Sequence, residues 1–322
     1  MANETDVRRF SAQCAQIMQQ IRRDIVGQED VVENTVIAMI AGGNVLLEGV
    51  PGIGKTRLVR SLARVFSLPF SRIQFTPDLM PADITGTNVL EQDSEGRRAY
   101  RFVPGPIFSS IVLADEINRA TPRTQSALLE CMEERQITEG GVTYSLHSPF
   151  LVIATQNPVE TQGTFPLPEA QLDRFLIRLS LGYPSRAEAL AMMRRFADGK
   201  HLETLAPVAK AEDVAKAAAL TCTCRVSEDV MDYMAALCEA ARDPERVRLG
   251  PSPRALLALM HACQALAAIR GRDYVIPDDV KELAVPVLAH RVLLRGINYQ
   301  QDSGDFIREL LGRVAVPTEA RA

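Results

Sequence analysis

Residues 44–58, NVLLEGVPGIGKTRL, decide the fold of this chain. The stretch opens with a short apolar run at 45–47, of the kind that forms a buried parallel strand. A glycine-rich turn follows at 49–56, and apolar residues then recur at helical spacing over 58–66. A strand, the pattern G-x-x-x-x-G-K-T and a helix, in this order, form the context that a phosphate-binding P-loop requires.

The residue types of this turn suit the binding of a nucleotide. Glycines let successive backbone N–H groups curl round a phosphate without Cβ clashes, and the N-terminus of the following helix adds a partial positive charge. Lys55 is expected to reach the β- and γ-phosphates, and the Thr56 hydroxyl to hold Mg²⁺. The sequence therefore predicts ATP and Mg²⁺ as cofactors, with contacts from Gly49, Pro51, Gly52, Ile53, Gly54, Lys55, Thr56 and Arg57.

Composition places the chain among ordinary globular proteins. It has 322 residues, of which 47% are hydrophobic and 24% charged, and a net charge of -4. This charge gives no overall attraction to nucleic acid or to an anionic membrane. The apolar runs are too short to span a membrane, and the N-terminus has no apolar signal region. We therefore expect a cytoplasmic protein in which the six cysteines are reduced thiols.

The order of the expected elements indicates an α/β fold. Beyond 45–47, buried strands are expected at 71–75, 111–114, 150–154 and 176–179. Helices alternate with them, which is typical of a parallel, doubly wound sheet. Two hairpins, at 87–102 with a turn at 93–96 and at 136–148, are expected as additions to this core.

The pattern changes near Pro184, where strands give way to helices. Ser185 and Glu188 have the spacing of a capping box, which marks the start of a helix. Helices are then expected at 188–196, 211–220, 227–242, 252–269 and 278–294. We therefore divide the chain into a nucleotide-binding α/β domain, 1–184, and a smaller all-α domain, 185–322.

A pair of carboxylates, Asp115 and Glu116, ends the apolar run 111–114. Alone, such a pair is often only a helix cap, but here it lies downstream of a P-loop. Asp115 is expected to fix Mg²⁺ through the water shell of the ion, because Mg²⁺ prefers carboxylates and retained waters. Glu116 is expected to polarise the water that attacks the γ-phosphate.

Several motifs together resemble the MoxR family of AAA+ ATPases. They are GVPGIGKT, PDLMPADITGT, IVLADEINRA, ATQNP and GTFPLPEAQLDRF, and the resemblance covers about residues 20–300. It implies a P-loop AAA+ core with a C-terminal helical lid domain. It also implies a Mg-dependent ATPase that forms a homo-oligomeric ring, usually a hexamer. Members are thought to act as chaperones, often beside partners with von Willebrand factor A domains, and the two hairpins would face the substrate.

The resemblance assigns roles to further residues. Asn157 matches the sensor 1 position, where an amide orients the attacking water, and Val26 and Gly27 match the segment that brackets adenine. Arg174 matches the arginine finger, which completes the site of a neighbouring subunit. Arg119 and Arg178 compete for that role, and a surface salt bridge is the alternative for all three arginines.

Arg254 can also be argued from its position. Ser252 and Pro253 mark a helix start, which puts Arg254 in the first turn, where a cation opposes the helix dipole. An anionic partner is therefore expected to offset the cost. The resemblance implies the γ-phosphate, contacted by a sensor 2 arginine, and a neighbouring carboxylate is the alternative.

Other functions stay open at this point. The ATPase subunit of a magnesium chelatase-like complex would have similar insertions. A nucleic-acid motor would need a basic hairpin, but 87–102 carries acidic residues among its arginines, so we do not expect nucleic acid as a partner. A scaffold that binds nucleotide without hydrolysing it would be expected to lose one of Lys55, Thr56, Asp115, Glu116 or Asn157, all of which are present.

Overall fold

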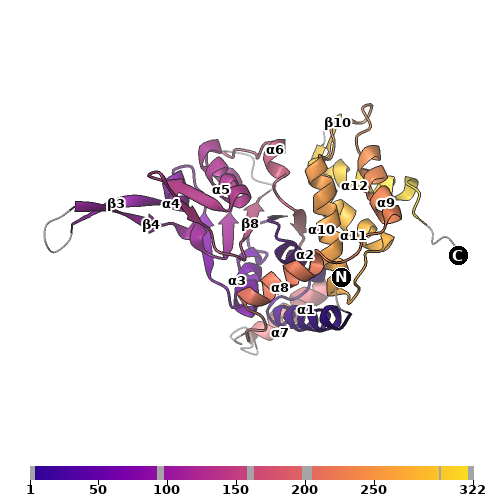
Figure 1. Ribbon diagram of the computed structural model, residues 1–322, viewed down its shortest axis with the longest axis horizontal. Coiled ribbons are helices and arrows are strands. Elements are labelled where there is room, and N and C mark those ends of the chain that lie inside the picture. The colour runs from indigo at the N-terminus through magenta and orange to yellow at the C-terminus, as the bar shows by residue number, and fades with distance from the viewer. Residues whose placement is uncertain (1–3, 93–97, 158–162, 198–204, 297–298, 318–322) are drawn as a thin grey trace.

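The computed structural model describes residues 4–92, 98–157, 163–197, 205–296 and 299–317, the last range without the side chains of 299–302. A five-stranded parallel sheet lies at its centre, in the order β2-β5-β8-β1-β9 (Figure 1). The strands are β1 (Val45–Gly49), β2 (Phe70–Gln74), β5 (Ile111–Asp115), β8 (Leu151–Gln156) and β9 (Ile177–Leu181). The expected α/β fold with a parallel sheet is confirmed. Ligands of such sheets bind at the carboxyl ends of the strands, which is where the P-loop lies.

Alternation along the strands explains the two layers of helices. In β1 the side chains of Val45 and Leu47 join the apolar core on one face of the sheet, while Leu46 joins the core on the other. The first core is covered by α1 (Glu4–Asp24), α2 (Glu29–Ile40) and α3 (Lys55–Val65). The second is covered by α4 (Pro81–Thr85), α5 (Pro122–Glu134) and the 3₁₀ turns η1 (Pro106–Phe108) and η2 (Ile117–Arg119).

Both expected hairpins are present. Strands β3 (Gly86–Gln92) and β4 (Arg98–Pro104) form an antiparallel arm that projects from the body, and β6 (Gln136–Glu139) pairs with β7 (Val142–Ser145) (Figure 1). The ring of Phe102 stacks on Tyr144, with 4.1 Å between centroids, and meets Phe108 edge-on. These aromatic contacts join the two hairpins at their base. The predicted turn at 93–96 lies outside the described residues.

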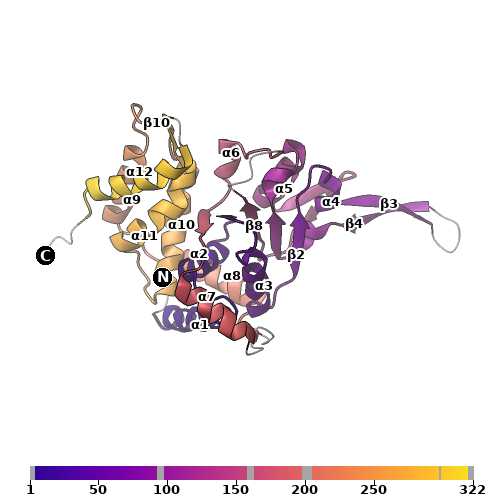
Figure 2. The same cartoon turned by 180° about the vertical axis from the view of Figure 1, so that it is seen from behind.

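The C-terminal part is mostly helical, and its elements from residue 228 onward lie on the side of the sheet away from the arm (Figures 1 and 2). The prediction of one helix over 278–294 is wrong beyond Leu288. Pro286 lacks an N–H and weakens the last turn, and residues 293–294 instead pair with a distant strand. The elements are α6 (Glu169–Leu172), α7 (Arg186–Ala197), α8 (Ala211–Thr221), α9 (Glu228–Ala240), β10 (Val247–Leu249), α10 (Pro253–Ile269), α11 (Pro277–Leu288), η4 (Ala289–Arg291), β11 (Leu293–Leu294) and α12 (Tyr299–Arg313). Helix α12 was not expected.

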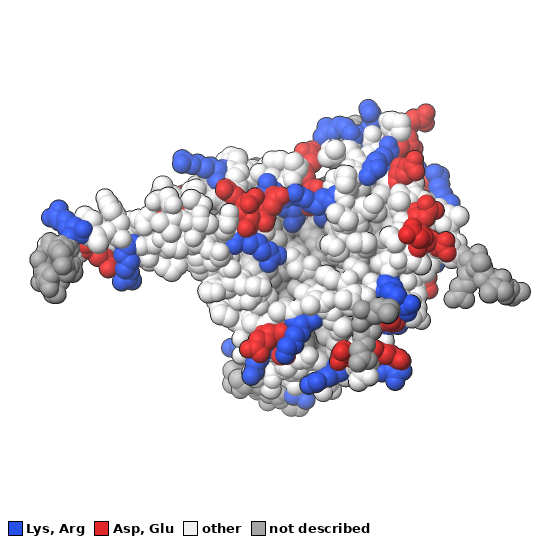
Figure 3. All heavy atoms as spheres, viewed as in Figure 1, with Lys and Arg blue, Asp and Glu red and all other residues white. Residues whose placement is uncertain are grey.

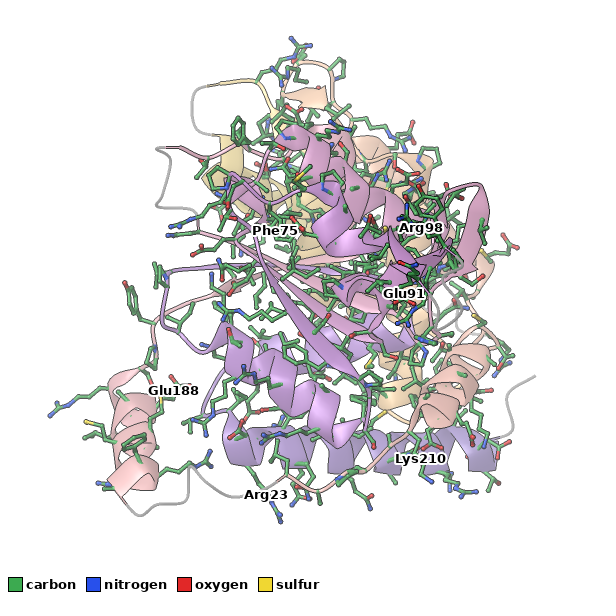
Figure 4. The ribbon with its side chains drawn as sticks, turned by 90° about the vertical axis from the view of Figure 1, so that its left-hand side faces the viewer. Arg23, Phe75, Glu91, Arg98, Glu188 and Lys210 are labelled. Carbon is green, nitrogen blue, oxygen red and sulfur yellow. The ribbon has the colours of Figure 1, made fainter. Side chains whose placement is uncertain are left out.

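The capping box at the start of α7 is confirmed. The Ser185 N–H donates to Glu188 Oε2 at 2.7 Å, and the Glu188 N–H donates to Ser185 Oγ at 3.3 Å. Helix α7 stands apart from its neighbours (Figure 4), and none of its side chains is buried. The division at 184/185 stays a prediction, because one apolar core runs from α1 and α3 into α10 and α11. In the described part of the chain, no helix is long and apolar enough to cross a membrane.

Candidate nucleotide site

Two adjoining cavities lie over the P-loop. The first, of about 860 Å³, is polar in character and is lined by P-loop residues, the first turns of α3, the end of β2 and the carboxylates at the end of β5. The second, of about 470 Å³, is lined by apolar residues that include Ile25, Val26, Ile53 and Tyr183. Both have the size of small-molecule sites. Pro51, Gly52, Gly54 and Arg57 line both cavities, and Lys55 and Thr56 line the first.

Backbone conformation explains why the loop needs glycine. Gly52 and Gly54 have φ angles of 84° and 95°, in the left-handed region that residues with a Cβ rarely adopt. Gly54 is the N-cap of α3, so the unpaired N–H groups of the first helical turn face the cavity. Gly49 is close-packed instead, since an added Cβ would lie 2.4 Å from the Ile53 side chain.

The Lys55 ammonium group bridges two strand ends. It donates to the carbonyl of Gly49 at the end of β1 and, at 3.3 Å, to that of Gln156 at the end of β8. Burial lowers the pKa of Lys55, and the carboxylates of Asp115, Glu116 and Glu48 act in the opposite direction. This position puts a cation at the floor of the cavity, where an anionic ligand would replace the two carbonyls as its partner.

The other predicted basic contact, Arg57, is held by α1. Its Nε and NH2 groups donate to Asp24 Oδ1 at 3.0 and 2.6 Å, and Ser61 also donates to this carboxylate. Burial alone would raise the pKa of Asp24, but these hydrogen bonds outweigh it and lower the pKa. Arg57 therefore lines the cavity as a fixed cation whose charge is already partly neutralised.

The predicted adenine segment meets α7. Val26 lines the second cavity, and Gly27 lies in a shallower pocket beside it. An added Cβ at Gly27 would lie 2.1 Å from Glu188 Oε1, and the φ of Gly27 is 73°. The positive φ favours glycine at this position, and any larger residue would also displace the Glu188 carboxylate. Glu188, the capping residue of α7, thus lies directly against Gly27.

The two carboxylates at the end of β5 are fixed by different neighbours. Thr155 of β8 donates to Asp115 Oδ1 at 2.6 Å and accepts from the Glu116 N–H at 2.9 Å. Gln74 donates to Glu116 Oε2 at 2.9 Å, and Arg119 forms an ion pair with the same oxygen at 3.1 Å. Glu116 has a φ of 58°, a strained conformation for a residue with a Cβ. The strand end therefore holds both acids at the wall of the cavity.

The donor set fits Mg²⁺. The Thr56 hydroxyl and the Asp115 carboxylate line the same cavity, and both are hard oxygen ligands. Magnesium commonly takes one or two protein oxygens and completes its shell with water and nucleotide phosphates. Asn157 is buried directly after β8, next to Gln156, whose carbonyl holds Lys55.

Two of the predicted arginines share one carboxylate elsewhere on the molecule. Glu133 of α5 forms ion pairs with Arg174 at 3.0 Å and with Arg254 at 2.5 Å. Figure 3 shows acidic and basic side chains gathered between α5 and α10. Arg254 lies in the first turn of α10, after the N-cap Ser252, as expected. Among the described residues, neither arginine lines the two cavities.

The competing arginines, Arg119 and Arg178, lie at carboxylates in or near the nucleotide cavity. Arg119 pairs with Glu116, and Arg178 lies 4.0 Å from Glu48 on the neighbouring strand β1. Their side chains are thus directed towards acidic groups in or near the cavity of the same chain, unlike Arg174.

A buried ion pair between Asp173 and Arg291 fixes the segment that carries Arg174. Asp173 accepts from Arg291 Nε at 2.7 Å and from the Ser252 hydroxyl at 2.9 Å. Arg291 is only 6% exposed and also donates to the carbonyl of Phe175 at 2.6 Å. The positions of Arg174 and of the N-terminus of α10, with Arg254, are therefore set together.

Comparison with known proteins gives the family. Residues 44–177 match the ATPase family associated with various cellular activities (AAA), and residues 239–310 match the AAA lid domain. The chain is 44% identical to the YeaC protein of Bacillus subtilis over 95% of both chains. It is 44% identical to Chaperone MoxR1 of Mycobacterium tuberculosis, over 85% of this chain and 74% of the relative.

This chain belongs to the MoxR family of AAA+ ATPases. The crystal structure of a proposed ATPase from Cytophaga hutchinsonii matches it with a TM-score of 0.88 and 37% identity, covering 98% of each chain. The fold of that ATPase therefore matches nearly the whole chain, including the parts that match the AAA family and the AAA lid domain.

Sequence reasoning missed several residues that shape this MoxR site. They are Arg72, Gln74, Glu133, Thr155 and Asp173. Arg72 and Gln74 alternate with apolar neighbours along β2, a pattern that places both on one face of the strand. That alternation could have identified them, whereas Glu133 has no local signal, because charged residues are ordinary on an exposed helix face.

Proposed function

We propose that this protein hydrolyses Mg–ATP in a ring of identical subunits, a hexamer, with each site completed by arginines of the neighbouring subunit. The observation that carries the proposal is the pairing of Arg174 and Arg254 with Glu133, outside the cavities of their own chain. A subunit alone then offers the phosphate cradle with Lys55, the base and the metal ligands, but not the two arginines, Arg174 and Arg254, that would stabilise charge on the transferred phosphoryl group.

Within one subunit, the P-loop N–H groups and Lys55 hold the phosphates. Bound Mg²⁺ would neutralise charge on the β- and γ-phosphates, held by Thr56 and Asp115. Glu116 accepts a proton from the attacking water, and Asn157 orients that water. The hydrogen bond from Gln74 and the ion pair with Arg119 direct the Glu116 carboxylate towards the cavity.

The geometry supports the proposal that the neighbouring subunit supplies Arg174 and Arg254. The ion pair between Asp173 and Arg291 holds Arg174 in place. Ser252, at the start of the helix that carries Arg254, donates to the same Asp173 carboxylate. Two guanidinium groups on one carboxylate form a cradle for an anion, because each can donate two hydrogen bonds in a plane. In the ring, the γ-phosphate of the adjacent subunit would take the place of Glu133 between them.

We further propose that hydrolysis is coupled to remodelling of a protein client in the cytoplasm, with a von Willebrand factor A domain protein as partner. The arm β3–β4 supports this role. Leu90 and Tyr100 face each other across the two strands and are 50% and 76% exposed. A relative bears the name Chaperone MoxR1. Exposed apolar side chains on a projecting hairpin are suited to contact another polypeptide.

The mass of the assembly and its ATPase rate together test the proposed ring. Light scattering with and without Mg–ATP should show a nucleotide-dependent oligomer, and the ATPase rate per subunit should rise with protein concentration. A monomer with a rate independent of concentration would contradict the shared site.

Replacing Lys55 by alanine should weaken nucleotide binding by about two orders of magnitude, because the substitution removes a partly buried cation from the phosphates. Titration calorimetry with ADP measures this loss. Lys216→Ala, at an exposed position on α8, is the matched control and should bind as wild type does. Unchanged affinity in Lys55→Ala would refute the P-loop assignment.

A further inference from the structure

Arg72 occupies an unusual place beside the predicted metal ligand. It lies in the middle of β2, an edge strand of the sheet, and its backbone is in register with Leu113 of β5. Gln74, two residues further on, is in register with Asp115. Because alternate side chains of a strand share a face, Arg72 and Gln74 both lie over the end of β5. Both also line the larger cavity.

The guanidinium group of Arg72 holds one oxygen of Asp115 with two donors. Its Nε and NH2 lie 3.1 and 2.7 Å from Asp115 Oδ2. The other oxygen, Oδ1, accepts from Thr155 at 2.6 Å. The Asp115 side chain is 13% exposed and that of Arg72 is 43% exposed. Both oxygens of the carboxylate therefore have a partner: Oδ1 accepts from Thr155, and Oδ2 pairs with the guanidinium group of Arg72.

We propose that Arg72 is a positioning residue that occupies the metal-binding oxygen of Asp115 and is displaced when Mg²⁺ binds with the nucleotide. The proposal rests on the nucleotide site proposed above. A guanidinium and a divalent cation repel each other, so they compete for one carboxylate oxygen whether the metal meets it directly or through a water. Arg72 can leave, because its half-exposed side chain borders an open cavity.

Displacement of Arg72 would also affect Glu116, the proposed catalytic base. Arg72 NH2 donates to Gln74 Oε1 at 2.7 Å, and the Gln74 amide donates to Glu116 Oε2 at 2.9 Å. The metal ligand and the base are thus joined through two side chains of one strand. When Arg72 leaves Asp115, Gln74 loses the hydrogen bond that orients its amide. The hydrogen bond from Gln74 to Glu116 therefore changes when the metal site is filled.

The test is the Mg²⁺ dependence of nucleotide binding, which does not require turnover. Polarisation of a fluorescent ADP is titrated with Mg²⁺ for wild type, Arg72→Ala, Arg72→Lys and Arg23→Ala. Loss of a competing ion pair of this exposure should lower the Mg²⁺ midpoint of Arg72→Ala roughly fivefold. Arg72→Lys should lie between the two, because lysine keeps the charge and loses the planar pair of donors. Arg23, an exposed arginine of α1 that does not line the nucleotide cavities, is the control for charge and should keep the wild-type midpoint.

The outcomes separate the inference from the function on which it rests. An unchanged or higher midpoint in Arg72→Ala, with normal nucleotide binding by wild type, overturns the displacement of Arg72 alone. Failure of wild type to bind ADP at any Mg²⁺ concentration overturns both. If circular dichroism shows that Arg72→Ala is unfolded, Arg72→Lys decides the question, and a midpoint equal to that of wild type overturns the proposal.

Discussion

Replacing Arg174 by alanine is expected to lower the kcat of ATP hydrolysis by about 10³-fold or more, which is the scale of an arginine finger. The variant should still bind nucleotide, because Arg174 lies on Glu133 and not at the cavity of its own chain. Steady-state kinetics and ADP calorimetry measure the two properties. Arg178→Ala is the control, since Arg178 faces Glu48 of its own chain and should not reproduce this separation of binding from turnover.

Mixing variants tests whether Arg174 acts in a neighbouring subunit. Arg174→Ala keeps Lys55, and Lys55→Ala keeps Arg174, so an interface between the two has all its parts. Equal amounts of the two inactive variants should recover about a quarter of the wild-type rate per subunit, as expected for random assembly in a closed ring. No recovery, in mixed rings shown by light scattering to assemble, would place Arg174 outside the mechanism.

Replacing Glu116 by glutamine should lower the hydrolysis rate by about 10²- to 10⁴-fold, because an amide cannot accept the proton of the attacking water. Nucleotide affinity should be retained, since the P-loop and Asp115 are unchanged. The glutamine oxygen can still accept from Gln74, which keeps the geometry of the wall intact. Single-turnover hydrolysis and ATP retention on a sizing column provide the measurement.

The control for this variant is Glu130→Gln, at an exposed position on α5. It makes the same chemical change away from the cavity and should hydrolyse ATP at the wild-type rate. Wild-type turnover in Glu116→Gln would show that another group takes the proton, and the assignment of the base would have to be abandoned.

Local sequence signals account for most of the fold. The P-loop could be predicted, because its strand, turn and helix are contiguous and the positive φ angles of Gly52 and Gly54 restrict the residue type. The strands were predicted because alternate side chains, such as Leu46 and Leu47, are buried on opposite faces. Five parallel strands then follow from the alternation with helices.

Long-range pairing explains what was missed. The apolar pattern over 278–294 resembles a helix throughout, but residues 293–294 pair with β10, about 45 residues earlier in the chain, and no local pattern reports such a partner. The same holds for the site. Glu133 becomes the shared partner of two arginines only in the folded chain, where Arg174 and Arg254 come to it from two other segments.

The arm β3–β4 has a mechanical consequence. Strand β3 has seven residues, which at about 3.3 Å per residue makes a rod of about 20 Å. Its root follows α4, which comes shortly after β2 in the chain, and β2 holds the contact between Gln74 and Glu116. A tilt of about 10° at the root would carry the far end of the described strand by about 3.5 Å. If its root tilted in this way, the arm would act as a lever, and a rotation too small to break the sheet would move the far end of the described strand by about the length of one residue of an extended chain.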